Sequence, residues 1–337
     1  MKREGNLLPR IVDRDNLLRA FLLASRGRRA SADVVAFRSD LDANLRRMAR
    51  QIEDGTIEVG RFTSFTIRDP KPRSIFAPAF AERVLHQALM AVAAPRLDRY
   101  LVDQTYACRV GRGTHAAVDQ AQRYARTFSH VLHLDVRHYF DAIDHARLLV
   151  LLRRLWKDRA VLALVERIVR SYEVEPGKGL PIGALTSQHL ANVYLGVFDH
   201  FAKQRLGCRG YVRYMDDMLL FADGAEPLRQ WLREARSWLE AELGLQLKPP
   251  VLRPVSHGFD FLGVRVWRWH RTLTGARKRR WATSLRRLCR GLSAGVLDER
   301  AFAARSGSLM AHAASVHSRG FRTSVLARLP WIDEIGA

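Results

Sequence analysis

Two apolar runs that flank a pair of aspartates constrain this chain more than any other feature. The segment RGYVRYMDDMLLF, residues 209–221, carries Asp216 and Asp217 between two short apolar stretches, which predicts a hairpin with both carboxylates at its tip. An isolated Asp-Asp pair is more often a turn or a surface charge than a functional site. A buried pair, however, is unfavourable unless a cation neutralises it, so the neighbouring segments decide between the two interpretations.

A third carboxylate ends another apolar run. Residues 131–140, VLHLDVRHYF, are typical of a buried strand that ends in acidic and aromatic residues, and they contain Asp135. Mg²⁺ prefers oxygen ligands and keeps waters and substrate phosphates in its other positions. Two such ions about 4 Å apart activate an attacking hydroxyl and stabilise the leaving oxygen. Convergence of Asp135 with the hairpin would therefore indicate nucleotidyl transfer.

The charge balance favours a polyanionic partner. The 337 residues include 56 Lys and Arg against 34 Asp and Glu, a formal net charge of +22. Each Lys or Arg that neutralises a phosphate releases condensed counterions, so nucleic acid is the leading candidate. A merely soluble, basic surface is the alternative.

The composition excludes several other classes of protein. Because 47% of the residues are hydrophobic and 7 Trp, 15 Phe and 8 Tyr need an interior, the chain is neither mainly disordered nor collagen-like. Cys108, Cys208 and Cys289 lie too far apart for a paired disulfide framework or a short-spaced zinc site. No run of about 18 apolar residues predicts a membrane span, and no apolar run follows the first charged residues. We therefore expect a cytoplasmic protein with no membrane partner.

Hydrophobic periodicity predicts the order of the elements. Helices are expected in residues 13–56, 80–128 around a loop at 106–117, 146–172, the end of 177–195 after a Gly-Pro loop, 226–243 and about 278–292. A hairpin is expected in 62–78, and paired strands in 244–254 and 258–267. In the last helix, Trp281, Leu285 and Leu288 are expected to face inward.

Four segments in this order, LDVRHYFDAIDH, GLPIGALTSQ, YMDD and FLGVRV, resemble a bacterial reverse transcriptase. The resemblance covers roughly residues 60–270. It implies an α+β fold of the right-hand polymerase class, with fingers, palm and thumb, a helical N-terminal lead-in and a short basic helical thumb. The corresponding domains would be 1–60 for the lead-in, 61–130 for the fingers with 146–178 added to the fingers or palm, 131–270 for the palm and 271–337 for the thumb.

The resemblance also assigns the metal site. It implies that Asp135, Asp216 and Asp217 are the catalytic carboxylates and that they bind two Mg²⁺ ions, with Mn²⁺ as a possible substitute. Val136 is a further metal ligand by the same resemblance.

Several residues would contact the incoming deoxynucleotide. Arg73 matches a fingers residue that holds the triphosphate, since guanidinium donors suit phosphate oxygens. Lys71 is a second candidate, for which a solvated hairpin turn is as good an interpretation. Phe140 matches an aromatic gate against the ribose 2′ hydroxyl, although a core aromatic is the alternative. In the segment GLPIGALTSQ, the resemblance implies that Ile182, Gly183 and Gln188 contact the nucleotide and that Ser187 supports them. Ser187 and Gln188 could equally cap the following helix.

The remaining assignments concern the primer and its duplex. Phe261, Leu262 and Gly263 resemble the primer-grip hairpin. Lys248 matches a proton donor to pyrophosphate only loosely, and an ordinary loop lysine is the preferred interpretation. Arg286, Arg287 and Arg290 are expected to contact the nucleic-acid backbone, because phosphate contacts position a duplex without reading its sequence.

The chain most resembles the reverse transcriptases of diversity-generating retroelements. Ile182 stands where many reverse transcriptases have Gln, and losing an amide contact should relax discrimination, as in a family that miscopies template adenines; a plain packing role is the alternative. This resemblance implies as partners a template RNA, an RNA/DNA duplex, deoxynucleotides, a structured noncoding RNA and a small basic oligomeric accessory protein. An antiphage-defence reverse transcriptase with a dedicated noncoding RNA is the rival, and an inactive RNA-binding scaffold is a third hypothesis. The short segment after residue 270 has no Cys/His cluster, which argues against a group II intron enzyme.

Overall fold

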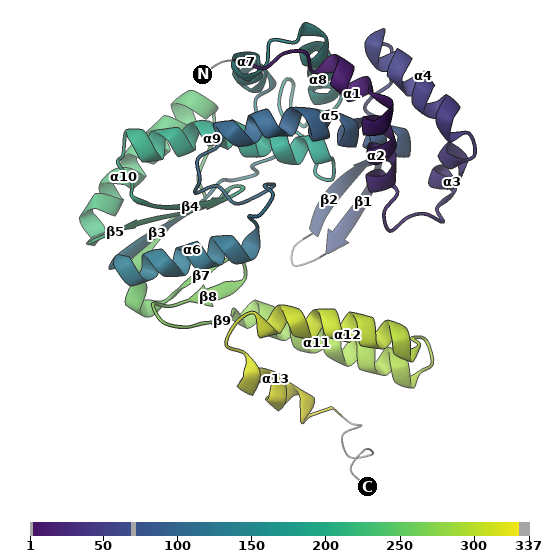
Figure 1. Ribbon diagram of the computed structural model, residues 1–337. Helices are drawn as coiled ribbons and strands as arrows, with labels where there is room; N and C mark the ends of the chain where they lie inside the picture. The colour runs from purple at the N-terminus through teal and green to yellow at the C-terminus, as the bar shows by residue number, and fades with distance from the viewer. Residues whose placement is uncertain (1–2, 69–71, 330–337) are drawn as a thin grey trace.

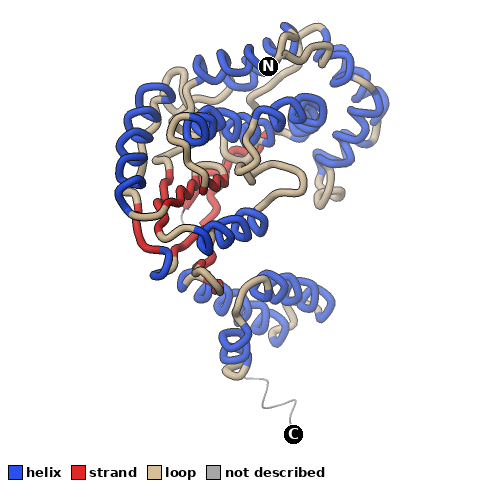
Figure 2. Tube along the Cα trace, turned by 60° about the vertical axis from the view of Figure 1, so that its left-hand side comes forward, coloured by secondary structure: helices blue, strands red, loops and turns tan. Residues whose placement is uncertain are grey.

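The structure is a computed structural model, and it describes residues 3–68 and 72–329. Lys71, one of the two candidate triphosphate ligands, lies outside the described residues, as does the end of the expected thumb. Figure 1 shows the order of the elements along the chain, and Figure 2 shows helices around the grouped strands. None of the helices within the described ranges is long and apolar enough to cross a membrane.

The hairpin expected at residues 209–221 is present and belongs to a four-stranded antiparallel sheet with the strand order β4-β5-β3-β6. Its strands are β3 (His130–Asp135), β4 (Gly210–Tyr214), β5 (Asp217–Ala222) and β6 (Val251–Pro254). The strand expected over 131–140 ends early, at Asp135, because the following residues form turns and His138 takes a left-handed φ of 46°.

Side chains alternate between the two faces of this sheet, as the pleat requires. Leu134 and Leu220 lie in the larger hydrophobic core on one face, whereas Leu219 and Phe221 lie in a smaller core on the other. Both faces are therefore covered, and Asp135 and Asp217 lie at one end of the sheet.

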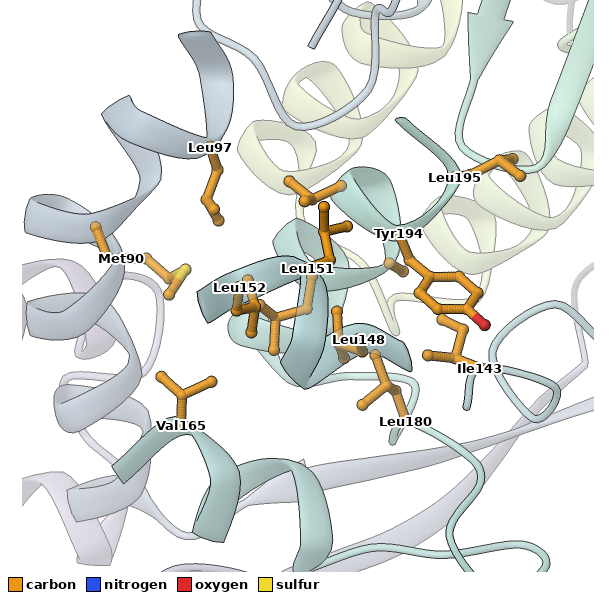
Figure 3. Close-up of a cluster of buried hydrophobic side chains, with 14 of the residues drawn as sticks. Met90, Leu97, Ile143, Leu148, Leu151, Leu152, Val165, Leu180, Tyr194 and Leu195 are labelled. Carbon is orange, nitrogen blue, oxygen red and sulfur yellow. The ribbon is translucent and has the colours of Figure 1, made fainter. Parts of the chain in front are cut away.

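Helices cover the larger core. They are α5 (Phe80–Tyr100), α7 (His145–Leu155), α8 (Arg159–Arg170), α9 (Leu185–Gln204) and α10 (Ala225–Trp238), the last continued by a π-helical turn at Leu239–Leu243. Figure 3 shows aliphatic and aromatic side chains from several of these helices meeting in one cluster: Met90, Leu97, Leu148, Leu151, Leu152, Val165, Tyr194 and Leu195. Each fully buried leucine of this kind stabilises the fold by about 2 kcal/mol.

Aspartate caps divide the helix expected over residues 146–172 into two. The carboxylate of Asp144 accepts a hydrogen bond from the N–H of Arg147 at 2.8 Å, and that of Asp158 accepts one from Val161 at 3.3 Å. These bonds satisfy backbone donors in the first turns of α7 and α8. Asp158 also accepts hydrogen bonds from the N–H groups of Leu7 and Leu8 at 2.9 and 3.1 Å, which ties the N-terminal segment to α8.

The N-terminal region is helical, as predicted, and packs on α5. Its helices are α1 (Leu8–Val12), α2 (Arg14–Ala24), α3 (Ala32–Arg38) and α4 (Leu41–Glu53). The rings of Phe21, Phe37 and Phe80 contact one another with centroids 5.4 to 5.9 Å apart. The hairpin of β1 (Phe62–Arg68) and β2 (Pro72–Pro78) follows as an independent two-stranded sheet, and Figure 1 shows it extending from the helical layer toward the centre of the molecule.

The smaller core lies between the four-stranded sheet, α6 (Thr114–Thr127) and a second antiparallel sheet of β7 (Phe259–Phe261), β8 (Val264–Val266) and β9 (Arg271–Leu273). A pairing of segment 244–254 with segment 258–267 is therefore wrong. Strand β6 pairs with β3, whereas β7 pairs with β8. The two-residue turn between β7 and β8 leaves β6 free to complete the larger sheet.

The C-terminal region forms α11 (Gly275–Ser293), α12 (Glu299–Ala314) and α13 (Arg319–Leu326), which lie at the opposite end of the molecule from α1–α4 in Figure 1. Trp281 and Leu285 face inward as predicted, and the indole N–H of Trp281 donates to the carbonyl of Leu309 at 2.9 Å. The prediction for Leu288 is wrong, because that side chain is only half-buried. Cys289, four residues after Leu285, continues the buried face instead.

Candidate active site

The register of the sheet brings the three aspartates together. Strands β3 and β5 pair so that Asp135 lies directly opposite Asp217, and Tyr214 and Asp217 close the β4–β5 hairpin. Only Met215 and Asp216 form the turn. Asp135 and Asp217 lie on the same face of the sheet, since directly opposed residues in an antiparallel pair share a face.

The turn itself has an unusual backbone. Met215 adopts a φ of 58°, whereas Asp216 is not among the left-handed residues, which is the pattern of a type II′ hairpin turn whose first central position favours glycine. A side chain in this region costs about 1 kcal/mol or more. The surrounding structure therefore has to hold the turn in place.

The three carboxylates lie close enough to repel one another. Burial raises the pKa of Asp216 to about 6, and the charge of Asp135 adds to this effect, while Lys248 opposes it. A bound cation would relieve the same repulsion. The carboxylate of Asp135 is 39% exposed, so a ligand from solvent can reach it.

The carboxylates and one carbonyl suit a hard divalent cation. Within the described ranges, no three carboxylate, imidazole or thiol groups gather into a closed metal site. Mg²⁺ bound through one or two carboxylates, waters and phosphates does not need such a site. Val136 pairs with Leu247 through a bridge made by the carbonyl of Asp135 and the N–H of Arg137, and this bridge does not use the carbonyl of Val136.

Lys248, for which the sequence favoured an ordinary loop lysine, lies beside the acidic residues. Its ammonium lies 2.7 Å from Oδ1 of Asp135, and its backbone N–H donates to the carbonyl of Asp135 at 2.8 Å. The residues are more than a hundred positions apart and meet only because residues 246–248 extend the edge of β3. The loose match of Lys248 to a proton donor did not predict its contact with Asp135.

His133 was missed as a site residue. Its Nε2 lies 2.5 Å from Oδ1 of Asp217, and its ring meets the ring of Phe261 edge-on with centroids 6.5 Å apart. Although burial lowers the pKa of His133, the hydrogen bond and the charge of Asp217 raise it overall. The alternation of a strand could have found this residue, because His133 precedes Asp135 by two and shares its face.

The glycine loop of residues 179–184 lies against two other parts of the site. The N–H of Leu180 donates to the carbonyl of Phe140 at 2.9 Å, and the N–H of Phe76 in β2 donates to the carbonyl of Ile182 at 2.7 Å. A Cβ at Gly183 would lie 2.8 Å from Ile75 and 3.0 Å from the carbonyl of Phe76. Glycine is therefore needed here because β2 approaches closely.

The other residues expected to contact the nucleotide differ in how far they are buried. The ring of Phe140 is half-buried and meets that of Tyr139 edge-on at 5.8 Å. Gln188 is exposed, whereas Ser187 is buried, and neither caps α9, whose first residue is Leu185 and which has no side-chain cap. Arg73 is an exposed residue of β2.

The expected primer-contacting turn lies beside the acidic end of the sheet. Leu262 and Gly263 adopt φ values of 49° and 80°, the pattern of a type I′ turn between β7 and β8. Phe261 is buried. A guanidinium nitrogen of Arg277 at the start of α11 donates to the carbonyl of Leu262 at 2.7 Å, so the C-terminal helical region contacts this turn directly.

The three arginines expected to contact nucleic acid lie on the exposed face of α11. Arg286, Arg287 and Arg290 are all exposed, opposite the buried residues Trp281 and Leu285. Arg287 also lines a cavity between α11 and α12.

An antiparallel sheet that presents aspartates at one end, with a hairpin and a basic helical region around it, defines a right-hand polymerase fold. The profile of the family described as "Reverse transcriptase (RNA-dependent DNA polymerase)" matches residues 70–266. This chain belongs to the reverse transcriptase family.

Two curated relatives are similar over part of their length. The chain is 24% identical over 243 residues to Protein YkfC of Escherichia coli (strain K12). The aligned part covers 59% of this chain and 64% of that protein. It is 23% identical over 172 residues to the Group II intron-encoded protein LtrA of Lactococcus lactis subsp. cremoris. Here the aligned part covers 48% of this chain and 29% of that protein. The chain thus spans less than two thirds of the length of each.

Solved telomerase structures are also similar. Telomerase from Candida albicans, in complex with a TWJ fragment of telomeric RNA, has a TM-score of 0.46 and 13% identity over 79% of this chain and 55% of that chain. Apo telomerase from Candida tropicalis has a TM-score of 0.48 and 10% identity over 67% of this chain and 52% of that chain.

Proposed function

We propose that this chain is an RNA-directed DNA polymerase that makes cDNA by nucleotidyl transfer with two divalent cations, Mg²⁺ or its substitute Mn²⁺. The single observation that carries the proposal is the register that sets Asp135 opposite Asp217, with Asp216 beside them in a two-residue turn. Membership of the reverse transcriptase family supports the choice of template and product.

The carboxylates of Asp135, Asp216 and Asp217, together with the carbonyl of Val136, would hold the cations. When bound, these ions lower the pKa of the primer 3′ hydroxyl and stabilise the leaving oxygen. Lys248, whose ammonium lies 2.7 Å from Asp135, would give its proton to the departing pyrophosphate.

Other residues of the chain would bind and orient the substrates. Arg73, with Lys71 as a second candidate, would contact the triphosphate, and Gln188 and Gly183 would line the nucleotide site. The ring of Phe140 would exclude a ribose 2′ hydroxyl. The turn at Phe261, Leu262 and Gly263 would position the primer end.

These roles suggest how the chain is divided into domains. We assign 1–60 to the helical lead-in, 61–130 with 146–178 to the fingers and adjoining palm, 131–270 to the palm and 271–337 to the thumb. Arg286, Arg287 and Arg290 would then follow the backbone of the RNA/DNA duplex. Their exposure on one face of α11 supports this assignment.

We further propose that the enzyme is error-prone at template adenines and acts in a diversity-generating retroelement. The support is Ile182, whose apolar side chain is half-buried and whose backbone carbonyl accepts a hydrogen bond from β2. An amide at this position could hydrogen-bond the incoming nucleotide, and isoleucine cannot. A structured noncoding RNA and a small basic accessory protein would be the partners of such a system.

One experiment tests both proposals. Purified protein is given Mg²⁺, deoxynucleotides and a primed RNA of mixed composition, with Asp216→Asn as control, and the cDNA is sequenced. Product that is absent in the control supports the polymerase, and errors concentrated at template adenines support the diversification role. Faithful product would refute that role and favour an antiphage-defence enzyme, whereas no product with any primed RNA or added accessory protein would refute the polymerase and favour an RNA-binding scaffold.

A further inference from the structure

A fully buried ion pair lies beneath the turn that carries Asp216. Arg213, in β4, and Asp199, in α9, both have no exposed side-chain surface. The guanidinium Nε and Nη2 of Arg213 each lie 2.6 Å from a different carboxylate oxygen of Asp199. This is the two-point geometry that gives arginine–carboxylate pairs their directional specificity.

Further polar groups complete the surroundings of this pair. Asp199 also accepts hydrogen bonds from the hydroxyls of Thr105 and Tyr211, both at 2.7 Å. Arg213 also donates to Oδ1 of Asn192 at 2.8 Å and to the carbonyl of Asn192 at 2.9 Å. A buried ion pair is tolerated when such bonds satisfy its remaining donors and acceptors, and here they come from α9, β4 and the loop after α5.

One more hydrogen bond of Arg213 leaves this network and reaches the catalytic turn. Its Nη1 donates to the carbonyl of Met215 at 3.0 Å. That carbonyl belongs to the peptide that joins Met215 to Asp216, and Met215 has the left-handed φ of 58°. The guanidinium therefore fixes the peptide plane just before the first aspartate of the turn, at the residue whose backbone is least favourable.

We propose that Arg213 is a positioning residue for the metal site: it holds the Met215 carbonyl so that the turn presents Asp216 and Asp217 toward Asp135, and Asp199 holds Arg213 in the required orientation. The proposal rests on the proposed function, because it assigns Arg213 to the carboxylates of that reaction. The rival explanation is that the ion pair only joins α9, β4 and the loop after α5.

Arg213→Lys separates these explanations. Lysine keeps the positive charge but lacks the planar fork, so it cannot serve Asp199 and Met215 together. Tyr211→Phe is the matched control, because it removes a hydrogen bond from the same buried carboxylate without touching the turn. Mn²⁺ binding is measured by electron paramagnetic resonance without nucleic acid, with Asp216→Asn as the reference for loss of the site.

We expect Arg213→Lys to weaken Mn²⁺ binding about tenfold, the usual scale for residues that orient metal ligands, while Tyr211→Phe binds Mn²⁺ as the wild-type protein does. Equal Mn²⁺ binding by Arg213→Lys and wild type, or an equal loss in Tyr211→Phe, overturns the proposal. The readout does not need cDNA synthesis. A wild-type protein that binds Mn²⁺ but copies no RNA would therefore contradict the proposed function and leave the comparison of variants interpretable.

A second-site variant gives an independent test. Met215→Gly makes the left-handed backbone favourable without help from the guanidinium. If Arg213 acts through the turn, the loss of Mn²⁺ affinity caused by Arg213→Lys shrinks in the Met215→Gly background. A loss of the same size in both backgrounds contradicts action through the turn.

The proposal stays testable if Arg213→Lys does not fold. Arg213→Met combined with Asp199→Leu removes both buried charges, a replacement that proteins often tolerate. This double variant lacks the bond to Met215, so we expect a cooperative thermal transition together with weakened Mn²⁺ binding. A folded double variant with wild-type Mn²⁺ affinity overturns the proposal.

Discussion

The ammonium of Lys248 lies 2.7 Å from the carboxylate of Asp135, and the backbones of the same two residues are joined by a hydrogen bond of 2.8 Å. A positive charge thus occupies the neighbourhood in which a divalent cation would bind. In the proposed reaction, Lys248 would repel this cation and would give its proton to the leaving group.

Lys248→Met should separate these two effects. Removing the ammonium takes a like charge away from the bound ion, so we expect Mn²⁺ binding to tighten by about 3- to 10-fold. Turnover should nevertheless fall by about 100-fold, because the proton donor is lost. Mn²⁺ titration and single-turnover primer extension measure the two quantities. Weaker metal binding together with unchanged turnover would contradict both roles.

The raised pKa of Asp216 makes a prediction about stability and pH. An aspartate whose pKa is raised from 3.8 to about 6 on folding stabilises the native state below about pH 4 and loses that contribution as pH rises to 6. Above pH 6 the native state therefore carries a buried charge at a cost. Asp216→Asn should raise the melting temperature in EDTA at pH 7.5 by about 2 °C, and by less at pH 5. An equal shift at both pH values in calorimetry would rule out this explanation.

Gly183→Ala should disrupt the contact between the loop and β2. Its φ is 124° and the new Cβ would meet the backbone of Phe76, whereas Gly113 has a similar φ of 112° and open space around its Cβ position. Gly113→Ala therefore carries the backbone strain without the clash and is the matched control. We expect primer extension to fall at least about tenfold further in Gly183→Ala than in Gly113→Ala, by a steric cost of about 1 to 3 kcal/mol. Equal losses would assign the whole effect to φ.

Ile182→Gln should make copying of template adenines more accurate. A side-chain amide offers one hydrogen bond to the correct nucleotide, worth about 1 kcal/mol, so misincorporation should fall by about 2- to 10-fold. Deep sequencing of cDNA measures this rate, and Ile182→Leu serves as an apolar control of similar volume. An error rate that is the same in all three proteins would leave Ile182 as a packing residue.

Arg286→Gln and Arg287→Gln should weaken template–primer binding regardless of sequence. Each lost phosphate contact should make the negative slope of log affinity against log salt shallower by about one unit. Arg229, which is exposed on α10 and paired with Glu226, provides the control variant Arg229→Gln. Fluorescence anisotropy across a salt series measures the slopes, and an unchanged slope in the double variant would exclude these arginines as phosphate contacts.

The parts of the fold that depend on local pattern could be predicted from the sequence. The hairpin around Asp216 follows from two apolar runs separated by polar residues, and the inward face of α11 at Trp281 and Leu285 follows from helical spacing. Leu288 was placed wrongly because three- and four-residue steps both suit a helix, and only the packing partner decides between them.

The long-range contacts could not be predicted in this way. Lys248 reaches Asp135 through an irregular extension of the sheet edge, and Gly183 meets β2 across a tertiary contact. Neither contact leaves a periodic signal. Arg213 is likewise hidden in sequence, because a charged residue within an apolar strand indicates a cost but does not name the partner that offsets it.

The two-residue turn between β4 and β5 also limits how chain length can vary. Side chains alternate along a strand, so one residue inserted into β5 beside this turn would shift the pairing with β3 and turn Asp217 away from Asp135. The long excursion through α7, α8 and α9, in contrast, joins β3 to β4 by loops that can lengthen at small entropic cost. Libraries of insertion variants should therefore tolerate changes in that excursion away from Phe140 and the glycine loop at 179–184, and should reject insertions at Met215.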